Sequence, residues 1–373
     1  MEYEQIKKEL AGMKSEMTSV ERMNAYLKGE EVDHLPYNLM DVELPLAEIL
    51  GYTTLQLNND FDVFAEVVKQ KELMLGIKGV SVGLDLRSVG RALGTTLQFP
   101  ERGIPCIKDH ILKDYKDFDK LEEFDPYKNE FLKGKLEFAK RLKDKFPDLP
   151  ISTSTNGPLS VAQSIRPVEF ILKDMRKNKE NLHKLIEISL ECCIKWVEAF
   201  SKEFGSVSFS FGDPVASGAL IGKKMYDEYA FPYEERLVNA VYEITGNKPV
   251  CHICGKSNHL WEDIGKLNIS GYSVDNVEDI EELKKALGDK MLIIGNIAPV
   301  EVMNLGSVDD VIEAVKSCII KAADSPKGYL LHTGCDVPIK TPLCNMEAYI
   351  YAVKKFGRNA KIGRLPEGIK EFV

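Results

Sequence analysis

Short apolar runs alternate with longer amphipathic segments along almost the whole chain of 373 residues. The apolar runs have the length and β-branched content of buried strands, and the segments between them repeat with the helical period. Strands that alternate with helices predict βαβ units and a parallel sheet, and eight units predict a closed (β/α)₈ TIM barrel, an α/β fold. The eight predicted strands are Leu35–Met40, Val80–Asp85, Leu149–Ser154, Val207–Phe211, Pro249–Ile253, Gly271–Val274, Met291–Gly295 and Gly328–His332.

The segments between the strands predict seven helices and one insertion. Residues 93–107 alternate in polarity and turn at Pro-Glu-Arg-Gly, which indicates a hairpin on the barrel rim after the second strand. Thr18 and Glu21 form a capping-box pattern that starts a helix in an N-terminal helical extension over residues 1–34. No flexible linker or repeat interrupts the pattern, so residues 1–373 are predicted to form one domain. The predicted helices are 63–75, 133–145, 168–204, 224–245, 280–287, 308–323 and 346–356.

Composition narrows the class of protein further. A hydrophobic content of 44% and a net charge of -9 fit a globular protein, and no basic stripe suggests a nucleic-acid partner. No run approaches the roughly 18 apolar residues that span a membrane, and the N-terminus lacks the apolar region of a signal peptide. We therefore expect a cytoplasmic location. The eight cysteines then favour metal binding or catalysis over a disulfide framework.

Polar residues cluster directly after the predicted strands, where (β/α)₈ barrels build their active sites. His252 and Cys254 are two residues apart at the end of the fifth strand and so share one face, while Cys251 and Ile253 share the other. Cys335 follows the eighth strand and would open onto the same mouth. Two cysteines and a histidine form a zinc-ligand set, although buried strand residues with incidental thiols are the alternative interpretation.

Several motifs then resemble the uroporphyrinogen decarboxylase superfamily, and most of all its methylcobamide:coenzyme M methyltransferase branch. The resemblance begins near Met17 and covers nearly the whole remaining chain. In that branch a His-x-Cys strand and a Gly-Cys-x-x-Pro turn together bind zinc, which implies His252, Cys254 and Cys335 as metal ligands and catalytic residues. The motifs are Ser152–Ala162 (STSTNGPLSVA), Gly212–Gly218 (GDPVASG), Pro249–Gly255 (PVCHICG), Gly295–Pro299 (GNIAP) and Gly334–Thr341 (GCDVPIKT).

The resemblance implies zinc-dependent transfer of a methyl group from a methylated corrinoid (methylcobalamin) to a thiol such as coenzyme M, or alternatively to tetrahydrofolate. The corrinoid would come from a separate corrinoid-binding protein, because the Asp-x-His-x-x-Gly signature of a cobalamin domain is absent. Asn156, Asp213 and Asp275 are candidate substrate-binding residues at the mouth. Capping of the following helices is the alternative role for Asn156 and Asp213, and Asp275 is also a candidate fourth ligand.

Two departures from related sequences guide the choice of reaction. The stretch Asn38–Glu43 has no arginine where true decarboxylases grip the substrate's carboxylates, which disfavours metal-free tetrapyrrole decarboxylation. Methyltransferase relatives carry glutamates where this chain has Val89 and Arg91, so recognition of the acceptor or partner is expected to differ there. A non-catalytic relative that binds a corrinoid or tetrapyrrole is the remaining alternative.

Overall fold

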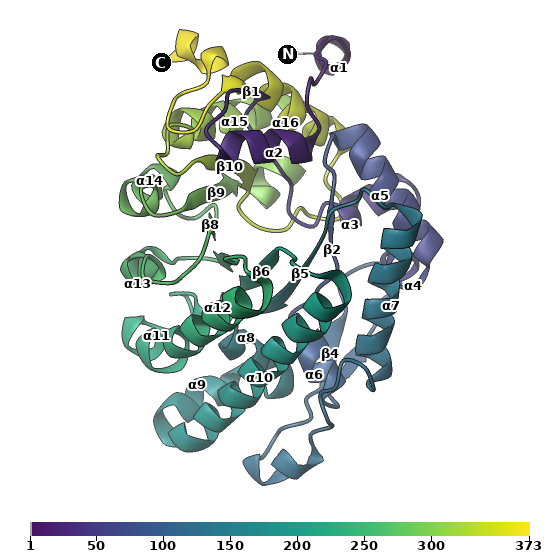
Figure 1. The fold of residues 1–373 in the computed structure, drawn as a ribbon, viewed down its shortest axis with the longest axis vertical. Coiled ribbons are helices and arrows are strands. Elements are labelled where there is room, and N and C mark those ends of the chain that lie inside the picture. Colours follow the sequence, from purple (N-terminus) through teal and green to yellow (C-terminus); the bar gives the residue numbers. More distant parts are fainter. Residues whose placement is uncertain (1) are drawn as a thin grey trace. The chain divides into compact units, whose positions relative to one another are not determined.

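The computed structural model describes residues 2–373, and contacts within the chain divide it into two compact units (Figure 1). The central unit is Gly79–Ser270, and the terminal unit combines the residues up to Lys78 with Gly271–Val373. Each unit places parallel strands beside helices, which confirms the predicted α/β class. The organisation of residues 1–373 as one domain stays a prediction.

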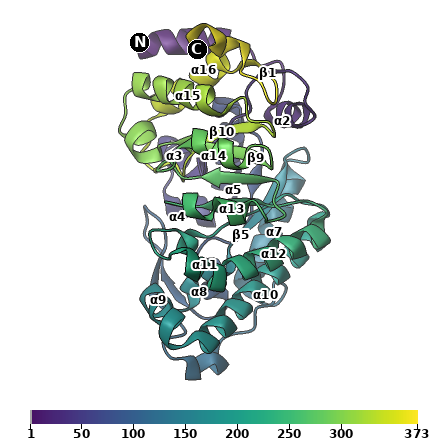
Figure 2. The ribbon, with the colours of Figure 1, turned by 90° about the vertical axis from the view of Figure 1, so that its left-hand side faces the viewer.

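The central unit contains four parallel strands in the order β7-β6-β5-β2. Its longest helix, α10, packs against α8 and α12 beside these strands (Figure 2). The strands are β2 (Val80–Ser81), β5 (Ile151–Asn156), β6 (Phe209–Gly212) and β7 (Val250–Ile253), with the hairpin strands β3 (Thr96–Gln98) and β4 (Cys106–Asp109). The helices are α6 (Ser88–Ala92), α7 (Glu130–Lys145), α8 (Pro158–Ile165), α9 (Val168–Lys177), α10 (Lys179–Phe204), α11 (Lys223–Tyr229), α12 (Phe231–Thr245) and α13 (Trp261–Ile264), with 3₁₀ turns at Tyr115–Lys120, Pro214–Ala216 and Asn258–Leu260.

The terminal unit contains three parallel strands in the order β10-β9-β8, and β8 and β9 are buried along their whole length. A second, two-stranded sheet pairs β1 with β11 near the two chain ends. The strands are β1 (Val32–His34), β8 (Gly271–Val274), β9 (Leu292–Ile297), β10 (Tyr329–Thr333) and β11 (Arg358–Ala360). The helices are α1 (Tyr3–Gly12), α2 (Ser19–Leu27), α3 (Glu43–Ile49), α4 (Thr54–Asn59), α5 (Phe61–Leu75), α14 (Ile280–Leu287), α15 (Val308–Ala322) and α16 (Leu343–Phe356), with a π-helix at Pro299–Asn304 and a 3₁₀ turn at Glu367–Phe372.

Seven of the eight predicted barrel strands are present, and the first is reduced to a single bridge. Tyr37 pairs in parallel with Leu331 of β10, supported by hydrogen bonds from Leu331 N–H to the Pro36 carbonyl and from Asn38 N–H to the Leu331 carbonyl. Pro36 has no N–H of its own, which shortens the ladder that this segment can form. Seven strand–helix repeats and one bridged segment are consistent with the (β/α)₈ class.

The predicted helices are confirmed in place, but two of them are broken. The helix predicted over 168–204 is interrupted at Asn178, whose φ of -148° and ψ of 52° are not helical, so it forms α9 and α10. The helix predicted over 224–245 is likewise divided at Ala230 into α11 and α12, and Pro232 stands in the first turn of the second. The capping box of Thr18 and Glu21 is present at the start of α2.

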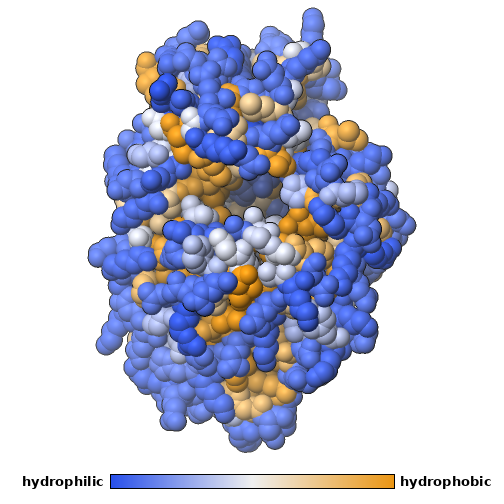
Figure 3. Space-filling model, viewed as in Figure 1, coloured by the Kyte–Doolittle hydropathy of each residue, from blue (hydrophilic) through white to orange (hydrophobic). Residues whose placement is uncertain are grey.

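The predicted rim hairpin is also confirmed. β3 and β4 pair antiparallel with a register shift between Thr96 and Leu97. Among the described residues, no helix combines the length and apolar character that crossing a bilayer requires. The face shown in Figure 3 is mostly hydrophilic, in keeping with the charged composition of the chain.

Candidate metal centre

His252 and Cys254 lie at the carboxyl end of β7 in the central unit. The Nε2 atom of His252 is 3.0 Å from the Sγ atom of Cys254, and both residues are half-buried. Cys251 and Ile253 point to the opposite, fully buried side, as the strand period predicted. Gly255 then turns the chain away with a φ of +72°, a conformation that favours glycine. The local sequence therefore presents one imidazole and one thiol together.

This pair fits two positions of a tetrahedral zinc site. Zinc binds a thiolate at about 2.3 Å and an imidazole nitrogen at about 2.0 Å, which places the two ligand atoms about 3.6 Å apart. The observed separation of 3.0 Å is close to that value, and a small side-chain rotation would accommodate the ion. The donor set therefore fits zinc.

Asp213, which follows β6, holds the strands rather than facing the open end of the sheet. Its backbone N–H donates to the His252 carbonyl at 3.0 Å, and its side chain is 0% exposed. Its carboxylate accepts hydrogen bonds from the backbone N–H and the hydroxyl of Ser160 in the first turn of α8. The carboxylate thus binds the first turn of α8, which follows β5, and makes no side-chain cap on the 3₁₀ turn Pro214–Ala216 after its own strand, so the expected capping of the following helix is wrong. Substrate binding by Asp213 stays a prediction.

Asp213 belongs to a buried acidic pair with Glu234 of α12. Both side chains are fully buried, and one oxygen of each (Oδ2 of Asp213 and Oε1 of Glu234) has no hydrogen-bond partner among the described residues. Burial and the neighbouring Asp213 raise the pKa of Glu234 to about 8, although a hydrogen bond from the Tyr226 hydroxyl opposes this. Burial raises the pKa of Asp213 to about 6. The two carboxyl groups therefore retain a proton between them at neutral pH.

The same pair keeps Cys251 unreactive. Burial raises the pKa of the Cys251 thiol well above its ordinary value, and the charges of Glu234 and Asp213 raise it further. A metal ligand must be a thiolate. Of the two cysteines on this strand, only Cys254 is thus suited to bind a metal.

Asn156 ends β5 and ties three segments of the central unit together. With its amide oriented so that both groups are satisfied, its nitrogen donates to the Gly212 carbonyl at 3.1 Å and its oxygen accepts from Leu86 N–H at 2.9 Å. Its backbone carbonyl also accepts a weak bond from the Cys193 thiol. The residue is half-buried at the strand ends. These contacts position the loops after β2 and β6, and a substrate contact by Asn156 stays a prediction.

Cys335 lies in the terminal unit, two residues beyond β10, and is half-buried. Gly334 before it donates to the Ile297 carbonyl at 2.8 Å, and a Cβ atom at Gly334 would lie 2.5 Å from the Asn276 nitrogen. Only glycine permits this close approach of two loops. His332 is buried and its Nδ1 lies 2.9 Å from the Thr333 carbonyl.

Acidic residues surround Cys335 within the terminal unit. Burial, and then the charges of Asp336, Glu43 and Cys335, raise the pKa of Asp41 to about 7. Asp275 is half-buried and accepts a hydrogen bond from Val277 N–H at 3.0 Å. Neither Glu43 nor Asp336 was predicted from the sequence as a neighbour of this site. Asp336 could have been predicted, because it directly follows Cys335 in the chain. Asp275 as a substrate-binding residue or fourth ligand stays a prediction.

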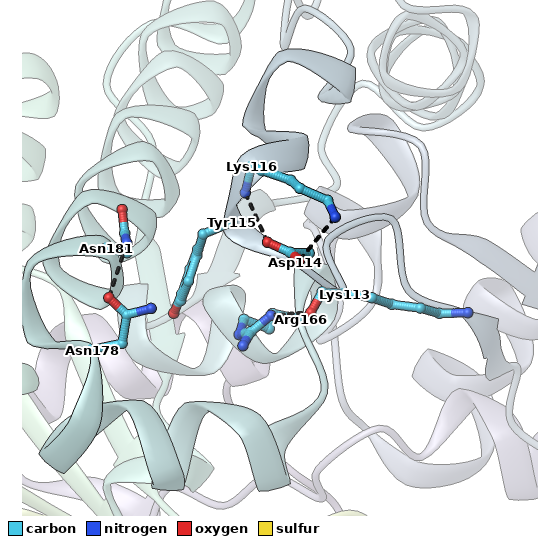
Figure 4. Close-up of a pocket in the computed structure, with 7 residues that line it drawn as sticks. All are labelled: Lys113, Asp114, Tyr115, Lys116, Arg166, Asn178 and Asn181. Carbon is cyan, nitrogen blue, oxygen red and sulfur yellow. Dashed lines mark hydrogen bonds and ion pairs between the residues drawn. The ribbon is translucent and has the colours of Figure 1, made fainter.

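A cavity of about 530 Å³ elsewhere in the central unit does not carry this chemistry (Figure 4). Its charged groups are already paired: Lys113 with Asp109 at 2.5 Å, Lys116 with Asp114 at 3.3 Å, and Arg166 with Asp174 at 2.8 Å. The other lining residues are Tyr115, Asn178 and Asn181, so no thiol or imidazole lines the cavity. The cavity is a cleft lined by groups that already pair with one another, two exposed lysine pairs and the buried Arg166–Asp174 pair.

The chain is similar over 92% of its length to methyltransferases of Methanosarcina species. It is 28% identical over 350 residues to the methylcobamide:CoM methyltransferase MtbA of Methanosarcina acetivorans, a match that covers 92% of this chain and 99% of the relative. It is 26% identical to a methylated-thiol–coenzyme M methyltransferase of Methanosarcina mazei, covering 92% and 91%. A solved methyltransferase structure from Methanosarcina mazei shares the fold with a TM-score of 0.73 at 22% identity, covering 91% and 99%.

The model of the uroporphyrinogen decarboxylase (URO-D) family matches residues 18–356, which include both halves of the predicted ligand set. That span confirms the resemblance seen in the sequence motifs. The chain belongs to the uroporphyrinogen decarboxylase (URO-D) family.

Proposed function

We propose that this chain is a zinc-dependent methyltransferase that moves a methyl group from a methylated corrinoid to a thiol, with coenzyme M as the acceptor class. The observation that carries the proposal is the His252–Cys254 pair at 3.0 Å, on a chain whose full-length relatives are named methylcobamide:CoM methyltransferases. We propose a corrinoid-binding protein as the source of the methyl group. The cytoplasmic location stays a prediction from the sequence.

His252, Cys254 and Cys335 would hold the zinc, and each offers one ligand atom, an imidazole nitrogen or a thiolate sulfur. The inclusion of Cys335 rests on its Gly-Cys-x-x-Pro turn. When bound, zinc supplies a Lewis acid that lowers the pKa of an acceptor thiol. Three protein ligands leave an open position, which is the pattern of catalytic rather than structural zinc sites.

The chain's own residues orient and insulate this reaction. Asp213 fixes the end of β7 through the His252 carbonyl, so the imidazole of His252 is presented from a rigid strand. In the transfer itself the acceptor sulfur attacks the methyl carbon and the new S–C bond forms as the Co–C bond breaks. The electron pair of that bond stays on cobalt, which passes from Co(III) to Co(I), and the thiol proton leaves to solvent.

Two alternatives receive less support. A match to the uroporphyrinogen decarboxylase of Microcystis aeruginosa reaches 30% identity but covers only 35% of this chain, whereas the methyltransferase relatives cover about nine-tenths. Tetrahydrofolate as acceptor finds no support among the relatives compared. A non-catalytic role gives no reason for the buried Asp213 to hold the His252 backbone in place.

The test combines metal content with turnover. Purified protein should hold about one zinc per chain, and Cys254→Ala and Cys335→Ala should each lose it while Cys344→Ala, a half-buried cysteine on α16, should retain it. Methylcobalamin with coenzyme M should show the absorbance change of cobalt reduction, and both zinc-free variants should fail to produce it. Full turnover by either variant would exclude the zinc mechanism.

A further inference from the structure

Two cationic side chains converge at the carboxyl end of β2 in the central unit. Arg91 lies in the last turn of α6 and Lys135 in the second turn of α7. Both contact the ring of Phe131, with Arg91 Cζ 4.0 Å and Lys135 Nζ 5.5 Å from its centroid. The ring centroid of Phe99, a residue of the rim hairpin, lies 5.1 Å from Arg91 Cζ. The ring of Phe131 thus lies against both cations, and the ring of Phe99 lies against Arg91.

The N–H donors of these cations are not taken up by other side chains, since Arg91 is exposed and Lys135 is half-buried. Neither the guanidinium of Arg91 nor the ammonium of Lys135 donates to, or forms an ion pair with, another residue that the structure describes. A guanidinium offers five N–H donors and an ammonium three. Burial lowers the pKa of Lys135, and Arg91 beside it lowers it further against the opposing charge of Asp85. Two neighbouring positive charges repel each other, and a bound anion would offset that repulsion.

Asp85 does not neutralise the pair. Its Oδ1 atom accepts hydrogen bonds from Arg87 N–H at 2.9 Å and from the Ser88 hydroxyl at 2.8 Å, at the start of α6. Two cations therefore face a single carboxylate that is already engaged by its own loop. The residual charge of the cluster is positive, on a chain whose net charge is -9.

The cluster stands on the same edge of the sheet as His252. In the strand order β7-β6-β5-β2, the end of β2 is three strand spacings from the end of β7. At about 4.8 Å per spacing this is about 14 Å along the sheet. A group held by Arg91 and Lys135 is therefore remote from the atoms that react beside His252.

We propose that Arg91 and Lys135 form a receptor for one oxyanion group, a phosphate, sulfonate or carboxylate, on a substrate of the methyl transfer. The inference rests on the proposed function. The source we infer is the phosphate of the corrinoid nucleotide, because the two-carbon chain of coenzyme M is too short to place its sulfonate about 14 Å from His252. Binding energy taken from such a remote group serves to align the reacting atoms.

The first experiment needs no turnover. Isothermal titration of the purified protein with sulfate should show binding, and Arg91→Gln and Lys135→Gln should each weaken it about tenfold or more, since each removes charge-assisted hydrogen bonds. Lys133→Gln is the matched control, because Lys133 lies on the same helix but is exposed and pairs with Glu137. Lys133→Gln should bind sulfate as the unmodified protein does.

The second experiment identifies the source of the anion. Turnover is compared between methylcobalamin and methylcobinamide, which lacks the phosphate-bearing nucleotide, and between coenzyme M and neutral 2-mercaptoethanol. In Lys135→Gln the preference for methylcobalamin in kcat/KM should fall about tenfold and the preference for coenzyme M should stay unchanged. A fall in the coenzyme M preference alone would contradict the corrinoid phosphate as the source.

Sulfate binding unchanged in both Arg91→Gln and Lys135→Gln, with both ratios unchanged, would overturn the receptor. Loss of sulfate binding in a protein that shows no methyl transfer would support the receptor while refuting the proposed function. The two failures are thereby distinguishable.

Discussion

Replacing Glu234 by glutamine should change how the stability of the central unit depends on pH. Glu234 and Asp213 lie fully buried behind β6 and β7 and share a proton. The pKa of Glu234 rises from 4.5 to about 8 on folding, chiefly through burial. Because the folded-state value is the higher one, this group stabilises the fold fully below about pH 4.5. The contribution is lost progressively as the pH rises towards 8.

The size of the effect follows from this elevation. Each pKa unit corresponds to about 1.4 kcal/mol. Between pH 6 and pH 8 the unfolded glutamate is ionised while the folded one still holds most of its proton, so about 2 kcal/mol of folding free energy is lost. Glutamine has nearly the same shape and can donate an N–H to Asp213 Oδ2 at any pH. Relative to the unmodified protein, Glu234→Gln should therefore gain about 2 kcal/mol in stability between pH 6 and pH 8.

Urea unfolding followed by tryptophan fluorescence measures this directly, because both tryptophans, Trp196 and Trp261, are buried in the central unit. Glu235→Gln is the control, since Glu235 is the exposed neighbour of Glu234 on α12. Groups remote from this pair titrate alike in all three proteins and cancel in the difference, so the measured difference reports on Glu234 together with its coupled neighbour Asp213. An equal difference between Glu234→Gln and the unmodified protein at pH 6 and pH 8 would refute the shared proton.

Three further changes test other parts of the structure. Gly334→Ala should lower the melting temperature measured by calorimetry, because its Cβ would lie 2.5 Å from the Asn276 backbone nitrogen, and an unchanged value would contradict that packing. Arg166→Met should cost about 3 to 5 kcal/mol in urea unfolding, because it strands the buried carboxylate of Asp174, whereas Lys113→Met, which removes an exposed ion pair, should cost less than about 1 kcal/mol. Acidification should release zinc cooperatively between about pH 6 and 4 as the ligands take up protons, measured with a chromogenic chelator, and retention of zinc at pH 4 would count against histidine and thiolate ligands.

Much of the fold follows from local pattern, because side-chain periodicity depends only on the backbone. The alternation of strands and helices is present as predicted, and the two-residue spacing of His252 and Cys254 sufficed to place both on one face of β7. The capping box at Thr18 likewise depends on a contact only three residues apart. Such features need no knowledge of distant segments.

Features that depend on distant partners were decided by the tertiary structure. In the sequence, Asp213 is a polar residue that follows a strand. Only the packing of α8 and α12 shows that its side chain is buried beside Ser160 and Glu234. The helical period continued through Asn178, where the folded chain breaks. Arg91 and Lys135 are 44 positions apart in the sequence and meet only over the ring of Phe131. The sequence alone predicted which residues could form a metal site, because a ligand's type and its face on a strand are local properties. Only the tertiary structure decided which residues are buried or paired, because those properties depend on what the rest of the chain packs against them.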